Sequence, residues 1–126
     1  MKLHVFITCI LFAFTLSAQE LSKSYFDIND LIIVDSKKAK ERIDSLEFVY
    51  LKNSDERKLA ELKLNAIEYY RSIGDFSHMK HILYDELQKV DDSTPLRIKL
   101  GLDFFLAANS GFEQKDKQFL QINSRV

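Results

Sequence analysis

Two histidines and an aspartate are the residues best suited, by type and spacing, to hold a metal ion. His78, His81 and Asp85 follow one another at steps of three and four, which puts their side chains on one face of a helix. Two imidazoles and a carboxylate suit zinc or iron, so these residues are candidate ligands. The neighbouring apolar residues Met79 and Ile82 should occupy the buried side and leave the histidines in water. We therefore expect no metal ion and no cofactor.

A pair of tyrosines could stack on a ligand or supply a catalytic hydroxyl. Tyr69 continues the apolar spacing of Leu62 and Ala66, which predicts a core position for it. Tyr70 can pack towards a following hairpin, and we keep it as a candidate partner-binding residue because tyrosines are enriched at binding surfaces. The sequence contains no phosphate-binding glycine loop, no nucleophile elbow and no serine with a plausible base. We therefore expect no enzyme.

The first 18 residues are typical of a secretory signal peptide. A basic Lys2 precedes an apolar run from Val5 to Leu16, and the small residues Ser17 and Ala18 follow. A run of twelve residues is too short to cross a bilayer, which takes about 20 residues. We predict cleavage after Ala18 and export to the periplasm or the medium, with no stable membrane anchor.

Residues 19–126 should form a single domain around one core. Removing residues 1–18 takes away the single cysteine, Cys9, so packing alone must hold this domain together. Lys plus Arg falls from 18 to 17 while Asp plus Glu stays at 19, which gives a formal charge of −2. This near balance offers no electrostatic reason to expect nucleic acid as a partner.

Apolar residues recur at steps of three and four through nearly the whole domain, which predicts helices. No stretch alternates with period two, so we expect no sheet. Gly74 should end one helix, and residues 109–111 should end another, before a sixth and shorter helix. Further helices should start at residues with capping side chains or a first-turn proline: Asp35–Ser36, Ser54–Asp55, Asp75 or Ser77, and Thr94–Pro95.

Six helices joined by short loops should be antiparallel neighbours. They divide into three hairpins, at residues 21–53, 54–91 and 94–123. Two segments, EYYRSIGDFSHMKHIL from residue 68 and DFFLAANSGFEQKDKQFL from residue 103, share an aromatic pair, a polar bend with glycine and a following aromatic residue. They start 35 residues apart, close to the ~34-residue period of tetratricopeptide helical hairpins.

At these residues the chain resembles the tetratricopeptide repeat family. In residues 59–90, Tyr70 matches the aromatic residue late in the first helix, and residues 74–76 match the turn. Met79 stands where the family has a small residue, usually alanine, and Leu83 matches the next large apolar position. The resemblance implies an all-α fold in which antiparallel hairpins stack as a short right-handed solenoid with a binding groove. It also implies the sensing part of a larger bacterial signalling protein as a context.

We therefore expect an exported helical-repeat module that binds a protein or peptide. The last hairpin still presents Phe119, Leu120 and Ile122 where a solenoid needs a polar closing helix. We count these three residues with Tyr70 as candidate partner-binding residues, and we expect docking or self-association at this hairpin. One alternative is a small closed helical bundle that acts as an exported inhibitor or structural factor. The other is a metal-binding helical protein or enzyme centred on the two histidines.

Overall fold

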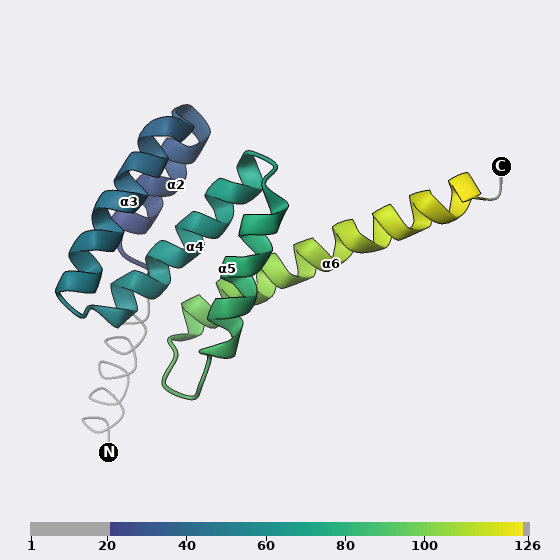
Figure 1. Ribbon diagram of the computed structural model, residues 1–126. Helices are drawn as coiled ribbons and strands as arrows, with labels where there is room; N and C mark the ends of the chain where they lie inside the picture. Colours follow the sequence, from purple (N-terminus) through teal and green to yellow (C-terminus); the bar gives the residue numbers. More distant parts are fainter. Residues whose placement is uncertain (1–20, 125–126) are drawn as a thin grey trace, which may run out of the picture.

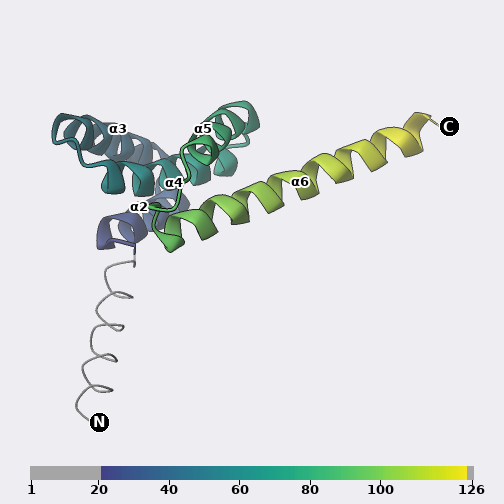
Figure 2. The same ribbon diagram turned by 90° about the horizontal axis from the view of Figure 1, so that it is seen from below.

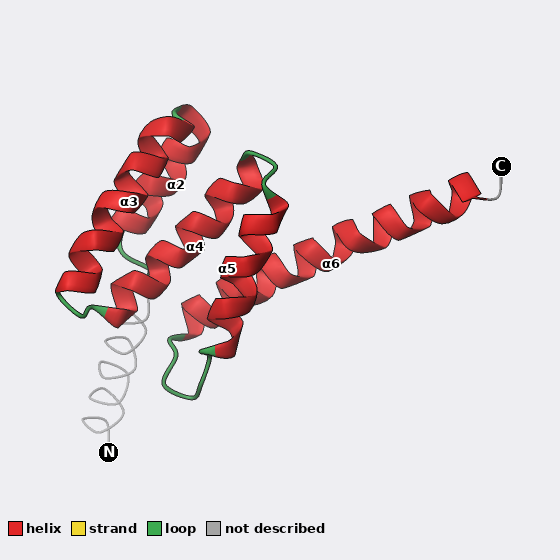
Figure 3. Ribbon diagram, in the orientation of Figure 1, coloured by secondary structure: helices red, strands yellow, loops and turns green. Residues whose placement is uncertain are grey.

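Five helices make up the part of the chain that the structure describes. The computed structural model describes the backbone of residues 21–124 and the side chains of residues 21–110. In chain order the helices are α2 (Lys23–Val34), α3 (Ser36–Lys52), α4 (Glu56–Ser72), α5 (Phe76–Gln88) and α6 (Leu96–Ser124) (Figures 1 and 3). No strand occurs among these residues, so the all-α prediction is confirmed for them. The predicted signal peptide, residues 1–18, lies outside the described residues.

Three of the helices begin at an aspartate. The Oδ1 atoms of Asp35, Asp55 and Asp75 each accept a hydrogen bond, 3.2 Å long, from the backbone N–H three residues further on. Each bond satisfies a helix donor that has no partner within the helix. Gly74 follows α4 with φ of 76°, a left-handed conformation that glycine adopts without steric cost. The helix starts predicted at these three aspartates and the predicted stop at Gly74 are confirmed.

The start of α6 lies one residue later than predicted. The carbonyl of Pro95 accepts hydrogen bonds from the N–H groups of Ile98 and Lys99, both at 3.1 Å, so the proline occupies the cap position. The hydroxyl of Thr94, predicted to cap this helix, accepts a hydrogen bond from the backbone N–H of Asp91 at 3.0 Å. Thr94 therefore closes the loop between α5 and α6.

The predicted break at residues 109–111, and the separate sixth helix after it, are wrong. α6 continues for 29 residues without interruption, and Figure 1 shows it as one long rod. Asn109, which we expected in a turn, lies inside this helix and is 4% exposed. A glycine inside a helix costs about 1 kcal/mol relative to alanine. With no proline nearby, that cost is too small to end a helix whose first half is packed.

α4 is the central helix of the array. It packs against each of the other four described helices, α2, α3, α5 and α6. Figure 2 shows α3 and α5 on one side of α4, and α2 and the start of α6 on the other. α2 also packs on α3, and α5 packs on α6, whereas the backbones of α3 and α5 do not meet. The flank of α4 between α3 and α5 is therefore covered by side chains and not by a helix that joins the two.

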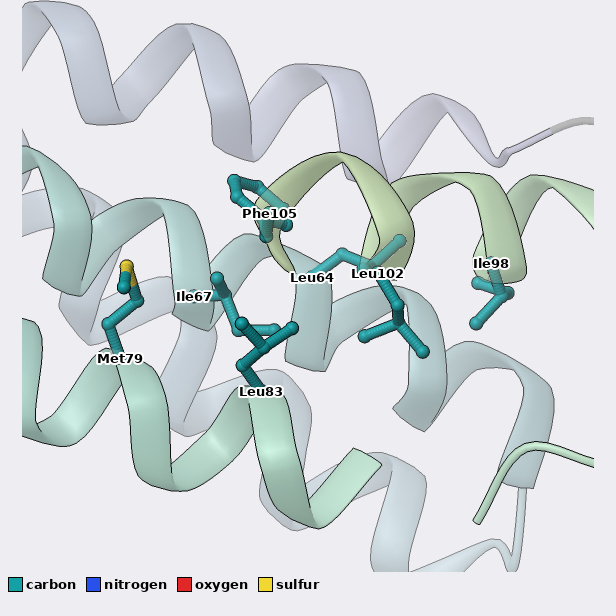
Figure 4. Close-up of a cluster of buried hydrophobic side chains, with 7 residues drawn as sticks. All are labelled: Leu64, Ile67, Met79, Leu83, Ile98, Leu102 and Phe105. Atoms are coloured by element: carbon teal, nitrogen blue, oxygen red, sulfur yellow. The ribbon is translucent and has the colours of Figure 1, made fainter. Parts of the chain in front are cut away.

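Two clusters of buried apolar side chains meet on α4, one on each side of the helix. Leu62 and Ala66 belong to the cluster shared with α2 and α3, while Leu64 and Ile67 belong to the cluster shared with α5 and α6. The predicted stripe on α4 correctly contained the first pair and omitted the second. The clusters consist of Ile28, Ile32, Ala39, Ile43, Leu62 and Ala66, and of Leu64, Ile67, Met79, Leu83, Ile98, Leu102 and Phe105 (Figure 4).

A buried polar link fixes α2 on α4. The Nδ2 atom of Asn65, a residue only 1% exposed, donates to the backbone oxygen of Tyr25 at 3.0 Å and to Oδ1 of Asn29 at 2.9 Å. Oε2 of Glu61 accepts from the hydroxyl of Ser22 at 2.6 Å, at the start of α2, where a negative charge is favourable. Because buried polar groups need partners in defined places, this link sets the position of α2 along α4.

The central position of α4 can be tested with one isoleucine and a matched control. Ile67 is 0% exposed and Ile33 is 85% exposed. We expect Ile67→Ala to lower the free energy of unfolding by about 2–5 kcal/mol, because it leaves a cavity in the core. Ile33→Ala should change it by less than about 0.5 kcal/mol. Urea unfolding followed by circular dichroism measures both, and equal losses would contradict this assignment.

The polar link between α2 and α4 makes a separate prediction about local stability. Asn65→Ala leaves the partly buried oxygen atoms of Tyr25 and Asn29 without this donor, a change that costs about 1–3 kcal/mol. We expect hydrogen exchange to speed up in α2 while α5 keeps its protection. Asn53→Ala, at an exposed position after α3, is the control. Equal loss of protection in α2 and α5 would show that Asn65 acts on the whole fold instead.

Candidate functional site

A small hollow opens between α3 and α5, over the flank of α4 that lies between them. Its floor is apolar and takes one residue from each helix, Ile43 from α3, Ala66 from α4 and Ile82 from α5. The space within the hollow is small, about 60 Å³. A space of this size can take the tip of a side chain, and it is far too small for a ligand as large as a nucleotide.

Charged side chains line the rim of the hollow in oppositely charged pairs. Lys40 donates a hydrogen bond to Asp44 along α3, and Nζ of Lys63 on α4 lies 3.5 Å from Oε2 of Glu47 on α3. Partial burial by itself lowers the pKa of Lys40. The hydrogen bond to Asp44 and the nearby phenol of Tyr70 outweigh this effect and raise the pKa above its ordinary value. Two cations face two carboxylates, so the rim has no excess charge to attract an ion.

Tyr69 and Tyr70 line the hollow from α4. Their rings meet edge to face with centroids 5.2 Å apart, and each ring packs against a different core cluster. The ring of His78 lies nearly parallel to that of Tyr70, at 17°, with centroids 5.0 Å apart. Tyr70 was a candidate partner-binding residue from the sequence, and the structure places it at the hollow. Tyr69, predicted as core, is half-buried.

The three candidate metal ligands have separate surroundings. Nδ1 of His78 lies 2.7 Å from Oδ2 of Asp75, the residue that also caps α5. A carboxylate oxygen of Asp85 lies 3.3 Å from Nζ of Lys89, and His81 is exposed. Among the side chains that the structure describes, no three from histidine, cysteine, aspartate and glutamate are grouped as metal ligands would be. Sharing a helix face therefore does not bring these residues together.

The charged residues of the hollow were not singled out by the sequence analysis. Residues 36–42 contain several lysines, a pattern typical of a solvated helix face. The useful signal was the spacing of Lys40, Asp44 and Glu47 at steps of four and three, parallel to the buried positions Ala39 and Ile43. That spacing marks one flank of α3, but it does not say which neighbour the flank faces.

An apolar stripe on the first half of α6 is a second exposed feature. Leu96, Leu100 and Phe104 are 51%, 52% and 65% exposed, and their spacing of four puts them on one face of the helix. Ile98 and Leu102 are buried in the same stretch. The first half of α6 therefore has apolar residues on the side that packs against other helices and also on part of the side that faces solvent.

The other candidate partner-binding residues belong to the second half of α6. Phe119, Leu120 and Ile122 follow a helical backbone, and their side chains lie outside the described residues. Because the turn expected before them is not formed, they extend a long helix and do not belong to the second half of a hairpin.

Comparison with known proteins leaves the chain without a family. No protein-family model matches it, and neither does any curated protein or solved structure. Within residues 21–124, no helix is both long and apolar enough to span a membrane. The geometry of the described residues is the basis for the function proposed below.

The separation of the candidate ligands predicts weak zinc binding. Titration calorimetry with zinc chloride at neutral pH should give no affinity tighter than about micromolar, because a zinc site needs three or four ligands around one point. His81→Ala should leave the titration unchanged. Submicromolar binding that is lost in His81→Ala would contradict this expectation and revive the metal-binding alternative.

Proposed function

We propose that this chain is an exported helical-repeat module that binds a segment of a protein or peptide in the hollow between α3 and α5. The composition of the hollow is the observation that carries this proposal. Its floor of Ile43, Ala66 and Ile82 is apolar, and two tyrosines stand beside it. Such a site combines an apolar surface with polar groups at its edge, which is the usual composition of a recognition site.

The chemistry of the hollow indicates which kind of segment it takes. An aliphatic or aromatic side chain inserted onto the floor would lose contact with water, which contributes about 25 cal/mol for each Å² of apolar surface buried. The phenols of Tyr69 and Tyr70 can exchange hydrogen bonds with the amides of the segment. Because the rim charges are already paired, an uncharged segment with one apolar anchor fits best.

The arrangement of the helices supports a stacked array over the closed-bundle alternative. The hairpin α2–α3 packs on α4, and the hairpin α4–α5 packs on α6 through both of its helices, while α3 and α5 stay apart. A closed bundle would bring its outer helices together around one core. We propose a right-handed, tetratricopeptide-like solenoid, in line with the resemblance carried by residues 59–90. Export rests on residues 1–18, and a role as the sensing part of a larger signalling protein rests on the resemblance.

A titration with short peptides tests the binding site directly. The ligands are blocked pentapeptides Gly-Ser-X-Ser-Gly in which X is leucine, phenylalanine or glycine. We expect the leucine and phenylalanine peptides to bind with a Kd of about a millimolar, since they bury little surface. Nuclear magnetic resonance should show shifts concentrated at the amides of Ile43, Ala66 and Ile82. The glycine peptide should give none.

Two tyrosine variants provide the matched comparison. Tyr70→Ala should weaken binding of the phenylalanine peptide by about fivefold, because it removes an aromatic contact at the hollow. Tyr84→Ala, on the same hairpin and outside the lining of the hollow, should leave the affinity unchanged. Shifts that gather at Leu96, Leu100 and Phe104 would place binding on α6 and overturn the assignment of the hollow.

A further inference from the structure

α6 is longer than the helices it packs against. Among the described helices it contacts α4 and α5, and Figures 1 and 2 show its second half projecting away from them. At 1.5 Å per residue, its 29 residues span about 44 Å. A helical arm of about 14 residues is marginally stable alone in water. We call residues 111–124 the arm. Packing against a neighbouring surface would stabilise its helix.

The spacing of phenylalanines along α6 shows which face of the arm needs cover. Phe105 is buried on α4 and α5, and Phe112 and Phe119 follow it at steps of seven. Residues seven apart lie close to the same face of a helix, since seven residues make nearly two turns. The arm thus continues the apolar register of the packed half beyond the helices that cover it.

The arm carries a short pattern that a two-fold axis can match. Residues 112–119 read FEQKDKQF, with phenylalanine at both ends and Lys115 beside Asp116 at the centre. Two such helices that run antiparallel about a two-fold axis between residues 115 and 116 place Phe112 opposite Phe119 of the second copy. The same axis places Lys115 opposite Asp116 of the second copy. A parallel arrangement in register would place Lys115 opposite Lys115 and Asp116 opposite Asp116 of the second copy, which is unfavourable because like charges repel.

We propose that the arm is a self-association surface, on which two copies of this chain pair antiparallel in this register. The four positions 112, 115, 116 and 119 share one helix face, so the pairing has two reciprocal ion pairs flanked by two aromatic contacts. Such reciprocity is what a two-fold interface requires. The arm is short, so the buried area falls below the ~1,200–2,000 Å² of a stable interface, and the dimer is weak and concentration-dependent.

Charge reversal at the centre of the arm tests both the partner and the register. Sedimentation equilibrium of the full chain should show a monomer–dimer equilibrium. Lys115→Glu or Asp116→Lys alone turns both ion pairs into like-charge contacts and should weaken the dimer about tenfold. The double variant Lys115→Glu/Asp116→Lys restores opposite charges across the axis and should return the dimerisation constant to within about threefold of the original. Arg97→Glu, an exposed reversal in the first half of α6, is the control.

Several outcomes would overturn the pairing. A chain that stays monomeric at all concentrations would do so. Single charge reversals that leave association unchanged would do so as well, and this second result is expected if the apolar residues 1–18 cause the association. Failure of the double variant to restore what the singles lose would reject the register. Circular dichroism checks that each variant keeps its helices. The pairing is independent of the hollow, so Lys115→Glu should still bind the phenylalanine pentapeptide with unchanged affinity.

Discussion

Burial of α4 on two opposite sides is the constraint on which the rest of the structure depends. Leu62 and Ala66 on one side and Leu64 and Ile67 on the other draw two helices each onto α4. A helix with apolar residues on opposite sides cannot satisfy both against a single neighbour. The two hairpins α2–α3 and α4–α5 are therefore held together through α4, and α6 is held against α4 and α5.

The same constraint explains why the hollow exists. α3 and α5 are each held by contacts with α4, and no contact between their backbones pulls them together. The short side chain of Ala66 is among those that line the space left between them. The pair Lys63 and Glu47 joins α4 to α3 at the edge of this space without closing it. The candidate site is thus a product of how helices stack and needs no loop of its own.

The proposed binding and the proposed self-association would use separate parts of the molecule. The hollow depends on the relation of α3 and α5 to α4, whereas the arm depends on the length of α6 and on the order of residues 112–119. In the proposed dimer, each copy's hollow would lie away from the two-fold axis, because the first half of α6 separates it from the paired arms. Two weakly paired copies could then engage two segments of one partner, which raises the effective affinity without new contacts.

The sequence predicts interactions between residues that are close in the chain, and it does not predict interactions between distant segments. The caps Asp35, Asp55 and Asp75 and the stop at Gly74 involve atoms a few residues apart, so residue type alone predicts them, along with the all-α class. Whether α6 bends near Asn109 depends on burial against other helices, and one mid-helix glycine did not decide it. Similarly, Tyr70 was a candidate because of its residue type. Its position beside Lys40 was not predicted, because Tyr70 lies on α4 and Lys40 on α3, about 30 residues apart in the sequence. Helical periodicity marks which face of a helix is apolar, and tertiary packing alone decides which helix covers it.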